Sequence, residues 1–230
     1  PWPLAPAIGS RAMHTTRLLV AFGGASSEHE VSLRSAASVL AAVDRRRFEP
    51  VPLGIARDGT WHTGPVGEAP TPAELAALVE HGEVVPDLRA LAAELVFPVL
   101  HGPYGEDGTI QGLFEILGLP YVGSGVLASS LCMDKIVQKH LVAAAAPEVP
   151  LVPWREVSAA GLADAAGLAR TVEEIRDALG FPCFVKPVNL GSSVGVSRVD
   201  HVDALPAALG VAARYDHRVI VERSEERRVG

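Results

Sequence analysis

Short apolar runs, each followed by glycine, histidine or a basic residue, recur along this chain. Residues 17–22, 51–55 and 95–100 are apolar and of strand length, and the segment from residue 30 onward has the spacing of a helix with one apolar side. A strand, a glycine turn and a helix open a βα unit, and ligands gather at the carboxyl ends of such strands. The first half of the chain is therefore predicted to open with a βα unit whose glycine turn is a candidate ligand site.

The second half contains a hairpin pattern with a polar loop. An apolar run at 183–185 leads to Lys186, and a loop of small residues at 189–193 precedes an alternating run at 194–199. Gly191 allows a sharp turn, and exposed backbone N–H groups with two serine hydroxyls suit phosphate oxygens. An ordinary surface hairpin with a solvated lysine explains the same residues equally well.

Composition and charge exclude several classes of protein. The 230 residues carry a net charge of −7, so there is no basic footprint for nucleic acid. No apolar run approaches the roughly 20 residues that a membrane span needs. Cys132 and Cys183 lie among apolar residues and are expected to be buried thiols in a reducing cytosol rather than a disulfide. The composition indicates a globular, cytoplasmic protein without nucleic-acid or membrane partners.

Both ends of the chain lack the pattern of a folded segment. Residues 1–16 are expected to be a disordered or non-native extension, because the stretch before Met13 has neither regular spacing nor the basic start and apolar centre of a signal peptide. Residues 223–230 are highly charged and are expected to be a non-native tail. The chain is therefore predicted to be a fragment.

Three ionisable residues stand out near predicted element ends. Glu28 follows the first strand, His101 follows the third, and Lys135 lies on a helix predicted over residues 128–146. A dinucleotide site is excluded, since the first turn has only two adjacent glycines and the second strand leads to no acidic residue. Each candidate also has a structural explanation: Glu28 as a carboxylate at a helix entry, His101 as a structural histidine and Lys135 as a surface cation.

Five sequence strings resemble one family. The loop is not a Walker A motif, in which the lysine follows the glycines. The string K-P-x-x-x-G-S-S-V-G-V from residue 186 closely resembles the D-alanine–D-alanine ligases of the ATP-grasp superfamily. Four further strings occur in that family's order: G-G-x-S-x-E-x-E-V-S from residue 23, H-G-x-x-G-E-D-G-T-I-Q-G from 101, G-L-P-Y-x-G-S-G from 118 and M-D-K from 133. The resemblance covers residues 17–222.

The resemblance implies an α/β fold with two parts. A pre-ATP-grasp domain with a Rossmann-like parallel sheet is expected over residues 17–146, and an incomplete α+β ATP-grasp domain over 147–222. A helix at 202–214 and a strand at 219–222 continue the second part. That strand is expected to lack sheet neighbours and to expose an apolar edge.

The resemblance also implies site residues. Glu28 would bind the ammonium of the first D-alanine and share a catalytic hydrogen-bond network with Ser192. His101 would lie at the D-alanine site, where it hydrogen-bonds the substrate carboxylate or assists proton transfer. The residues implied for the nucleotide are Lys135, Lys186, Gly191, Ser192, Ser193 and Glu222, the last at the amino group of adenine or the ribose edge. ATP and Mg²⁺ (or Mn²⁺) are the implied cofactors, with the metal ligands expected beyond the C-terminus.

The implied activity is ATP-dependent ligation of two D-alanines to D-alanyl-D-alanine through an acyl phosphate, for peptidoglycan precursor synthesis. The partners implied are D-alanine and ATP, and the full-length enzyme is expected to be a homodimer. The alternatives are a D-alanine–D-lactate or other ATP-grasp carboxylate–amine ligase, and an inactive nucleotide-binding fragment. The chain as given is expected to bind nucleotide weakly and to form no product.

Overall fold

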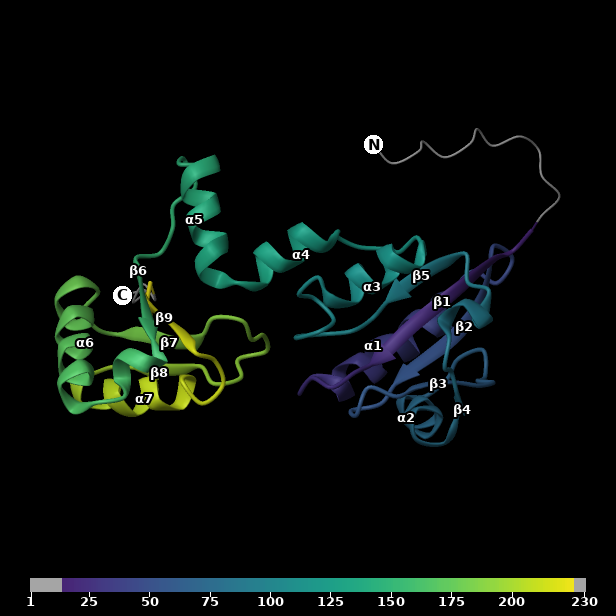
Figure 1. Ribbon diagram of the computed structural model, residues 1–230, viewed down its shortest axis with the longest axis horizontal. Coiled ribbons are helices and arrows are strands. Elements are labelled where there is room, and N and C mark those ends of the chain that lie inside the picture. Colours follow the sequence, from purple (N-terminus) through teal and green to yellow (C-terminus); the bar gives the residue numbers. More distant parts are fainter. Residues whose placement is uncertain (1–13, 226–230) are drawn as a thin grey trace, which may run out of the picture. The chain divides into compact units, whose positions relative to one another are not determined.

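The computed structural model of the chain describes residues 14–225 (Figure 1). These residues form two compact units. The first runs to Gly105 and resumes at Thr109–Gly125, and the second consists of Glu106–Gly108 and the residues from Val126 onward. Each unit has its own sheet and hydrophobic core. The predicted α/β class is confirmed, and the first sheet is mixed, with two parallel and two antiparallel strand pairings among the described residues.

A five-stranded sheet organises the first unit. Its strands are β1 (Thr16–Gly23), β2 (Phe48–Ile55), β3 (Trp61–Thr63), β4 (Glu83–Val84) and β5 (Leu95–Pro98). The order is β4-β3-β2-β1-β5, and β1 runs parallel to both of its neighbours. Leu19 of β1 is opposite Val51 on β2 and Val96 on β5. β3 and β4 are antiparallel additions at one edge.

Helices cover both faces of this sheet, because β1 is apolar on both sides. They are α1 (His29–Ala42), α2 (Pro72–His81), the short 3₁₀ helix η1 (Leu88–Leu91) and α3 (Thr109–Leu117). Val20 and Phe22 pack with α1 and α2 in one core, whereas Leu19 and Ala21 pack with η1 and α3 in another. The alternation of side chains along one strand thus builds two cores.

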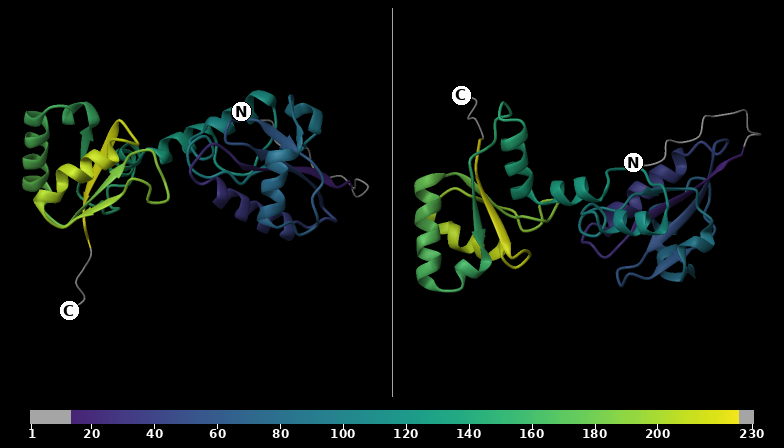
Figure 2. Two further views of the ribbon diagram at one scale, coloured as in Figure 1. Left: turned by 90° about the horizontal axis from the view of Figure 1, so that it is seen from below. Right: turned by 45° about the horizontal axis from the view of Figure 1, so that its top comes forward.

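A four-stranded antiparallel sheet organises the second unit, in the order β6-β9-β7-β8. Its strands are β6 (Trp154–Ser158), β7 (Cys183–Pro187), β8 (Ser197–Val199) and β9 (Arg218–Arg223). The helical elements are α4 (Val126–Met133), α5 (Lys135–Ala145), η2 (Ala159–Leu162), α6 (Ala165–Ala178), η3 (Val202–Ala204) and α7 (Leu205–Ala212). Helices α6 and α7 pack on one face of the sheet, and α5 lies on the other (Figure 2). Ile136 of α5 packs there with Val188 and Ile220. Helix α5 therefore belongs to the second unit, although the sequence assigned it to the first domain.

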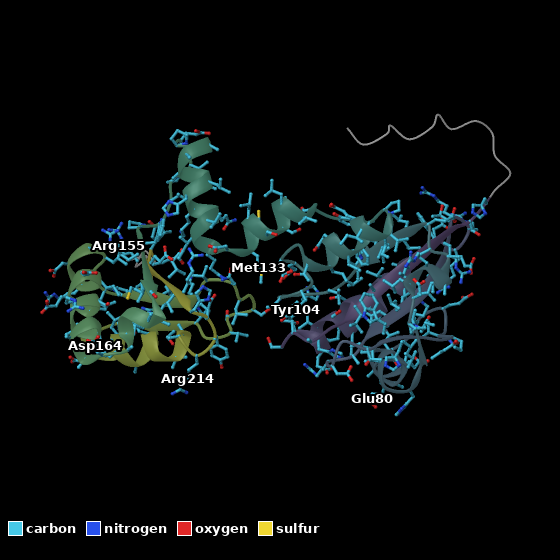
Figure 3. The ribbon with its side chains drawn as sticks, in the orientation of Figure 1. Glu80, Tyr104, Met133, Arg155, Asp164 and Arg214 are labelled. Atoms are coloured by element: carbon cyan, nitrogen blue, oxygen red, sulfur yellow. The ribbon has the colours of Figure 1, made fainter. Side chains whose placement is uncertain are left out.

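Several local expectations were wrong. The helix predicted over residues 128–146 is two helices, because Asp134 leaves helical geometry and its side chain caps α5. Met133, labelled in Figure 3, is the last residue of α4. Cys132 is exposed on α4, and only Cys183 has the predicted burial. The returning strand of the hairpin begins at Ser197 rather than at residue 194.

The last strand has no exposed edge. β9 pairs with β6 on one side, where Val157 is opposite Val219, and with β7 on the other, where Val185 is opposite Val221. Val219 and Val221 are completely buried. The expectation that this strand would lack neighbours is wrong, because residues 154–158, which precede the hairpin, supply the second neighbour.

The structure describes part of each predicted extension. The ring of His14 lies 3.0 Å from the carboxylate of Glu94, Thr16 begins β1, and Arg223 ends β9. The rest of the predicted extensions, residues 1–13 and 226–230, lies outside the described residues. Among the helices within residues 14–225, none has the length and apolar character that a bilayer crossing requires.

Candidate active site

Glu28 and His101 lie together in the first unit, in the loops that follow the carboxyl ends of β1 and β5. Ser26 ties the two loops, since its Oγ donates to the carbonyl oxygen of His101 at 2.7 Å and accepts from the N–H of Glu28 at 3.1 Å. A Cβ atom on Gly102, whose φ is +71°, would lie 2.6 Å from Oε2 of Glu28. The absence of a side chain at Gly102 therefore leaves space for the Glu28 carboxylate.

Helix α1 fixes the imidazole of His101. The Nε2 atom of His101 lies 3.1 Å from Oγ of Ser35 on this helix. One turn earlier, Ser32 is fully buried; its Oγ donates to the carbonyl oxygen of Val99 and accepts from the N–H of Gly23. These bonds hold α1 against the ends of β1 and β5. None of these three serines, Ser26, Ser32 and Ser35, was predicted to be a site residue.

A pocket of about 390 Å³ opens beside this loop pair, within the first unit. Its walls are mainly apolar, and Gly23 approaches so closely that a Cβ there would lie 2.4 Å from the carbonyl oxygen of Ile55. The side chain of Tyr104, labelled in Figure 3, lines the pocket and is 62% exposed. The pocket lies at the carboxyl ends of the parallel strands, where such sheets bind ligands.

The second unit collects all the lysines of the chain. The sequence contains three lysines, Lys135, Lys139 and Lys186, and the remaining 17 of its 20 Lys and Arg residues are arginines. Lys186 Nζ donates to Oε2 of Glu222 at 2.5 Å, and Lys139 Nζ lies 2.8 Å from Oε1 of the same carboxylate. Two residues predicted separately, Lys186 and Glu222, are thus in direct contact, and Lys139 joins them without having been predicted.

Strand alternation explains why these groups meet. On β9, Val219 and Val221 point into the core under α6 and α7, so Ile220 and Glu222 point toward α5. On β7, the buried Val185 faces the same core, which leaves Lys186 on the α5 side. Helix α5 then brings Lys135 and Lys139, one turn apart on one helix face, to this side of the sheet.

Lys135 is bound to the backbone that leads into the Gly-Ser loop. Its Nζ donates to the carbonyl oxygens of Val188 at 3.0 Å and Leu190 at 2.5 Å. Burial lowers the pKa of Lys135 below its ordinary value, and the nearby ammonium of Lys186 lowers it further. An ammonium has three donors, so one remains after these two bonds.

The carboxylate of Glu222 is ionised by its neighbours. Burial raises its pKa, but the hydrogen bonds from Lys139 and Lys186 outweigh burial, and the net pKa lies below the ordinary value. Two ammonium groups therefore contact this one carboxylate, and the ammonium of Lys135 lies near that of Lys186, so positive charge gathers on this side of the sheet. Such a concentration of positive charge suits an anionic ligand.

The Gly-Ser loop has an unusual backbone. Ser192 and Ser193 have φ angles of +48° and +61°, in the left-handed region that non-glycine residues seldom adopt. The start of the loop is anchored at Asn189, whose backbone N–H and side-chain amide both donate to Asp216. A residue in such a backbone conformation costs on the order of 1–3 kcal/mol, and residues of this kind cluster in functional loops whose surroundings hold them in place.

No metal centre is formed within residues 14–225: no group of three or more His, Cys, Asp or Glu residues there is placed to hold an ion. The described site residues instead fall into two groups. The first unit joins Glu28 and His101, and the second unit joins Lys135, Lys186 and Glu222 beside the loop of Gly191, Ser192 and Ser193.

Two family models match the chain in sequence order. Residues 17–124 match the model described as the D-ala D-ala ligase N-terminus, and residues 143–228 match the D-ala D-ala ligase C-terminus. Among curated proteins, the chain is 46% identical over 231 residues to a D-alanine–D-alanine ligase from Mycolicibacterium vanbaalenii and 40% identical over 233 residues to one from Thermoanaerobacter sp.. These alignments cover 90% and 94% of this chain and 60% and 62% of the relatives.

Solved structures give the same result. The D-alanine–D-alanine ligase from Coxiella burnetii is similar with a TM-score of 0.77 and 31% identity, over 91% of this chain and 64% of that one. The VanG D-Ala:D-Ser ligase from Enterococcus faecalis is similar with a TM-score of 0.73 and 33% identity, over 92% of this chain and 63% of that one. The chain thus spans about 60% of the length of the curated relatives it matches.

Proposed function

Because this chain belongs to the D-alanine–D-alanine ligase family, we propose that its protein uses ATP to join two D-alanines into D-alanyl-D-alanine for cell-wall synthesis. The observation that carries the proposal is the convergence of Lys135, Lys186 and Glu222 beside the Gly-Ser loop. A sheet face that carries lysines next to a glycine- and serine-rich loop suits a triphosphate, because ammonium groups and hydroxyl groups both bind phosphate oxygens.

The chemistry follows from charge. A free carboxylate repels nucleophiles, so the first D-alanine has to be activated by transfer of the γ-phosphoryl group of ATP to its carboxylate. The amine of the second D-alanine then attacks the acyl phosphate, and inorganic phosphate leaves with one former carboxylate oxygen. Both steps build negative charge on phosphoryl oxygens, which positioned cations stabilise.

The lysines have separate parts in this proposal. Lys135 keeps one donor for a phosphate after binding the carbonyl oxygens of Val188 and Leu190, and it fixes the entry to the loop at the same time. Lys186 carries the second positive charge. Glu222, at the end of β9, presents acceptor oxygens for the amino group of adenine or the ribose edge.

Glu28 and His101 are proposed to bind the first D-alanine. The Glu28 carboxylate beside Gly102 would hold the ammonium group, and His101, positioned by Ser35, would bind the carboxylate or move a proton. Ser192 is proposed to complete the hydrogen-bond network at the reacting centre. Divalent metal would supply further charge compensation, and the proposal assigns it no ligand among residues 14–225.

A second candidate activity differs only in the acceptor. The VanG D-Ala:D-Ser ligase from Enterococcus faecalis is similar over 92% of this chain. We test both with the full-length protein, Mg·ATP and D-alanine, alone or paired with D-serine or D-lactate, and identify the product by mass. D-alanyl-D-alanine as the main product supports the proposal. A mixed product supports the second candidate, and the absence of ATP-dependent product in every mixture contradicts both.

A further inference from the structure

Lys139 has no part in the phosphate contacts proposed above, yet it forms an ion pair with Glu222 as Lys186 does. The Nζ atom of Lys139 lies 2.8 Å from Oε1, and that of Lys186 lies 2.5 Å from Oε2. The side chains of Lys139 and Glu222 are each only 13% exposed. One carboxylate therefore holds two ammonium groups, one on each oxygen, at a site that is largely shielded from water.

The ammonium of Lys186 cannot bind a phosphate with its full charge while it is paired with the carboxylate of Glu222. Its side chain is 27% exposed, twice as much as that of Lys139, and its ammonium lies 5.6 Å from the ring centre of Phe184. If Lys186 moved away from a singly compensated carboxylate, a shielded negative charge would be left without a partner, which is strongly unfavourable. With Lys139 on the other oxygen, the charge stays compensated.

We propose that Lys139 is a positioning residue: it is the permanent counter-ion of Glu222, and it allows Lys186 to transfer its ammonium from Glu222 to a nucleotide phosphate. The inference rests on the proposed function, because it takes nucleotide as the ligand. Lys139 acts through Glu222 and Lys186 and has no contact with the reacting atoms.

The choice of basic residue fits this exchange. Of the 20 Lys and Arg residues in the chain only three are lysines, yet both ion-pair partners of Glu222 are lysines. An arginine would bind a carboxylate through two parallel N–H groups and hold it in a fixed geometry. An ammonium is a compact charge on a flexible stem, which suits a group that changes partners.

The proposal predicts coupling between the two lysines in ATP binding. In the full-length protein, Lys139→Met leaves Glu222 with Lys186 alone, so the affinity for Mg·ATP should fall about tenfold, the scale of one charge-assisted contact. Adenosine, which has no phosphate, should bind as it does to the wild type. In a Lys186→Met background, Lys139→Met should cause no further loss of ATP affinity, because the Lys186 ammonium that Lys139 frees for the phosphate is already absent.

Isothermal titration with Mg·ATP and saturation-transfer NMR with adenosine measure these affinities. Arg176→Met is the matched control, since it removes one exposed cation from α6, on the opposite face of the sheet. Lys139→Arg keeps the charge and should retain most of the affinity, and thermal melts without nucleotide report whether each variant folds.

An effect of Lys139→Met confined to ATP and absent in the Lys186→Met background supports the inference. Equal losses for ATP and adenosine, or the same loss with and without Lys186, would show a purely structural role for Lys139 and overturn it. Failure of the wild type to bind ATP would overturn the proposed function itself, and the inference with it.

Discussion

Asp134 joins the start of helix α5 to Arg218 at the start of β9. One oxygen of its carboxylate accepts from the N–H groups of Ile136 and Val137, and the other accepts from Nη1 of Arg218 at 2.5 Å. The Nε of Arg218 also donates to Oε1 of Glu156 on β6 at 2.7 Å. The helix that carries Lys135 and Lys139 is thereby fixed to two strands of the sheet that it faces.

Replacement of Asp134 by alanine should destabilise the second unit. The change removes a helix cap and leaves the guanidinium of Arg218 with one carboxylate, so the free energy of unfolding should fall by about 2 kcal/mol. Urea denaturation of the chain measures the loss. Asp134→Ser keeps a capping oxygen and removes only the ion pair. Its free energy of unfolding should therefore lie between those of the wild type and Asp134→Ala. A loss for alanine within the error of the measurement would mean that α5 is held by apolar packing alone.

Lys186→Ala should slow ATP-dependent phosphate release in the full-length protein by at least about tenfold and leave the fold intact. The loss of one charge-assisted phosphate contact is worth about 1.5–3 kcal/mol. A coupled assay for inorganic phosphate measures turnover, and circular dichroism checks the fold. The matched Arg176→Met variant, altered on the other face of the sheet, should turn over normally. Near-normal turnover by Lys186→Ala would rule out its phosphate role.

Glu28→Gln should weaken the binding of the first D-alanine strongly and the binding of ATP only slightly. The substitution keeps the size of the side chain and removes the charge that would bind an ammonium group. Steady-state kinetics with D-alanine and ATP varied in turn separate the two effects. Glu30→Gln is the control, because Glu30 pairs with the exposed Arg57 at 3.5 Å. Equal losses for both substrates in Glu28→Gln would count against the assigned contact.

Glu222 should make a pH-dependent contribution to stability. Its pKa in the folded chain lies below the ordinary value of 4.5, because Lys139 and Lys186 favour the ionised form. The unfolded state therefore binds the proton more readily as pH falls, and stability is lost. The contribution is complete above about pH 4.5 and disappears as pH falls through the lower folded pKa.

The test of this linkage is a comparison of wild type with Glu222→Gln by urea denaturation between neutral pH and pH 3. The difference in unfolding free energy between the two should be constant near neutrality and should shift against the wild type below about pH 4.5. A difference that stays constant throughout would show that Glu222 has the same pKa in the folded and unfolded states.

The sequence predicted those features that short strings determine. The glycine turns, the strand ending in Lys186 and the positions of Glu28 and His101 depend on neighbouring residues, and the structure has them at strand ends. Lys139 was missed because a lone lysine in a helix carries no signal of its own. Its position four residues after Lys135 would have placed it on the same face of the helix.

The features that the sequence did not predict depend on contacts between distant residues. The central place of β9 requires pairing with residues 154–158, which are more than fifty positions earlier. The break at Asp134 has no glycine or proline to mark it, and it is decided by the cap that the aspartate forms and by Arg218. The contact of Lys186 with Glu222 needs the register of β7 with β9.

The chain as given should bind nucleotide weakly and form no D-alanyl-D-alanine. Residues 14–225 contain the lysines that we propose for the phosphates, but no group of His, Cys, Asp or Glu placed to hold a metal ion between them. Thermal melts with and without Mg·ATP, together with an ADP-release assay with D-alanine, measure binding and turnover. Steady turnover would show that these residues already contain a complete site.

The measurement that tests the central claim most directly is oxygen transfer from substrate to phosphate. The full-length protein is incubated with Mg·ATP and D-alanine labelled with ¹⁸O in its carboxylate, and the inorganic phosphate is analysed by mass spectrometry. Activation through an acyl phosphate predicts one ¹⁸O atom in each phosphate released, and none without D-alanine. Phosphate released without label while D-alanyl-D-alanine forms would contradict the account.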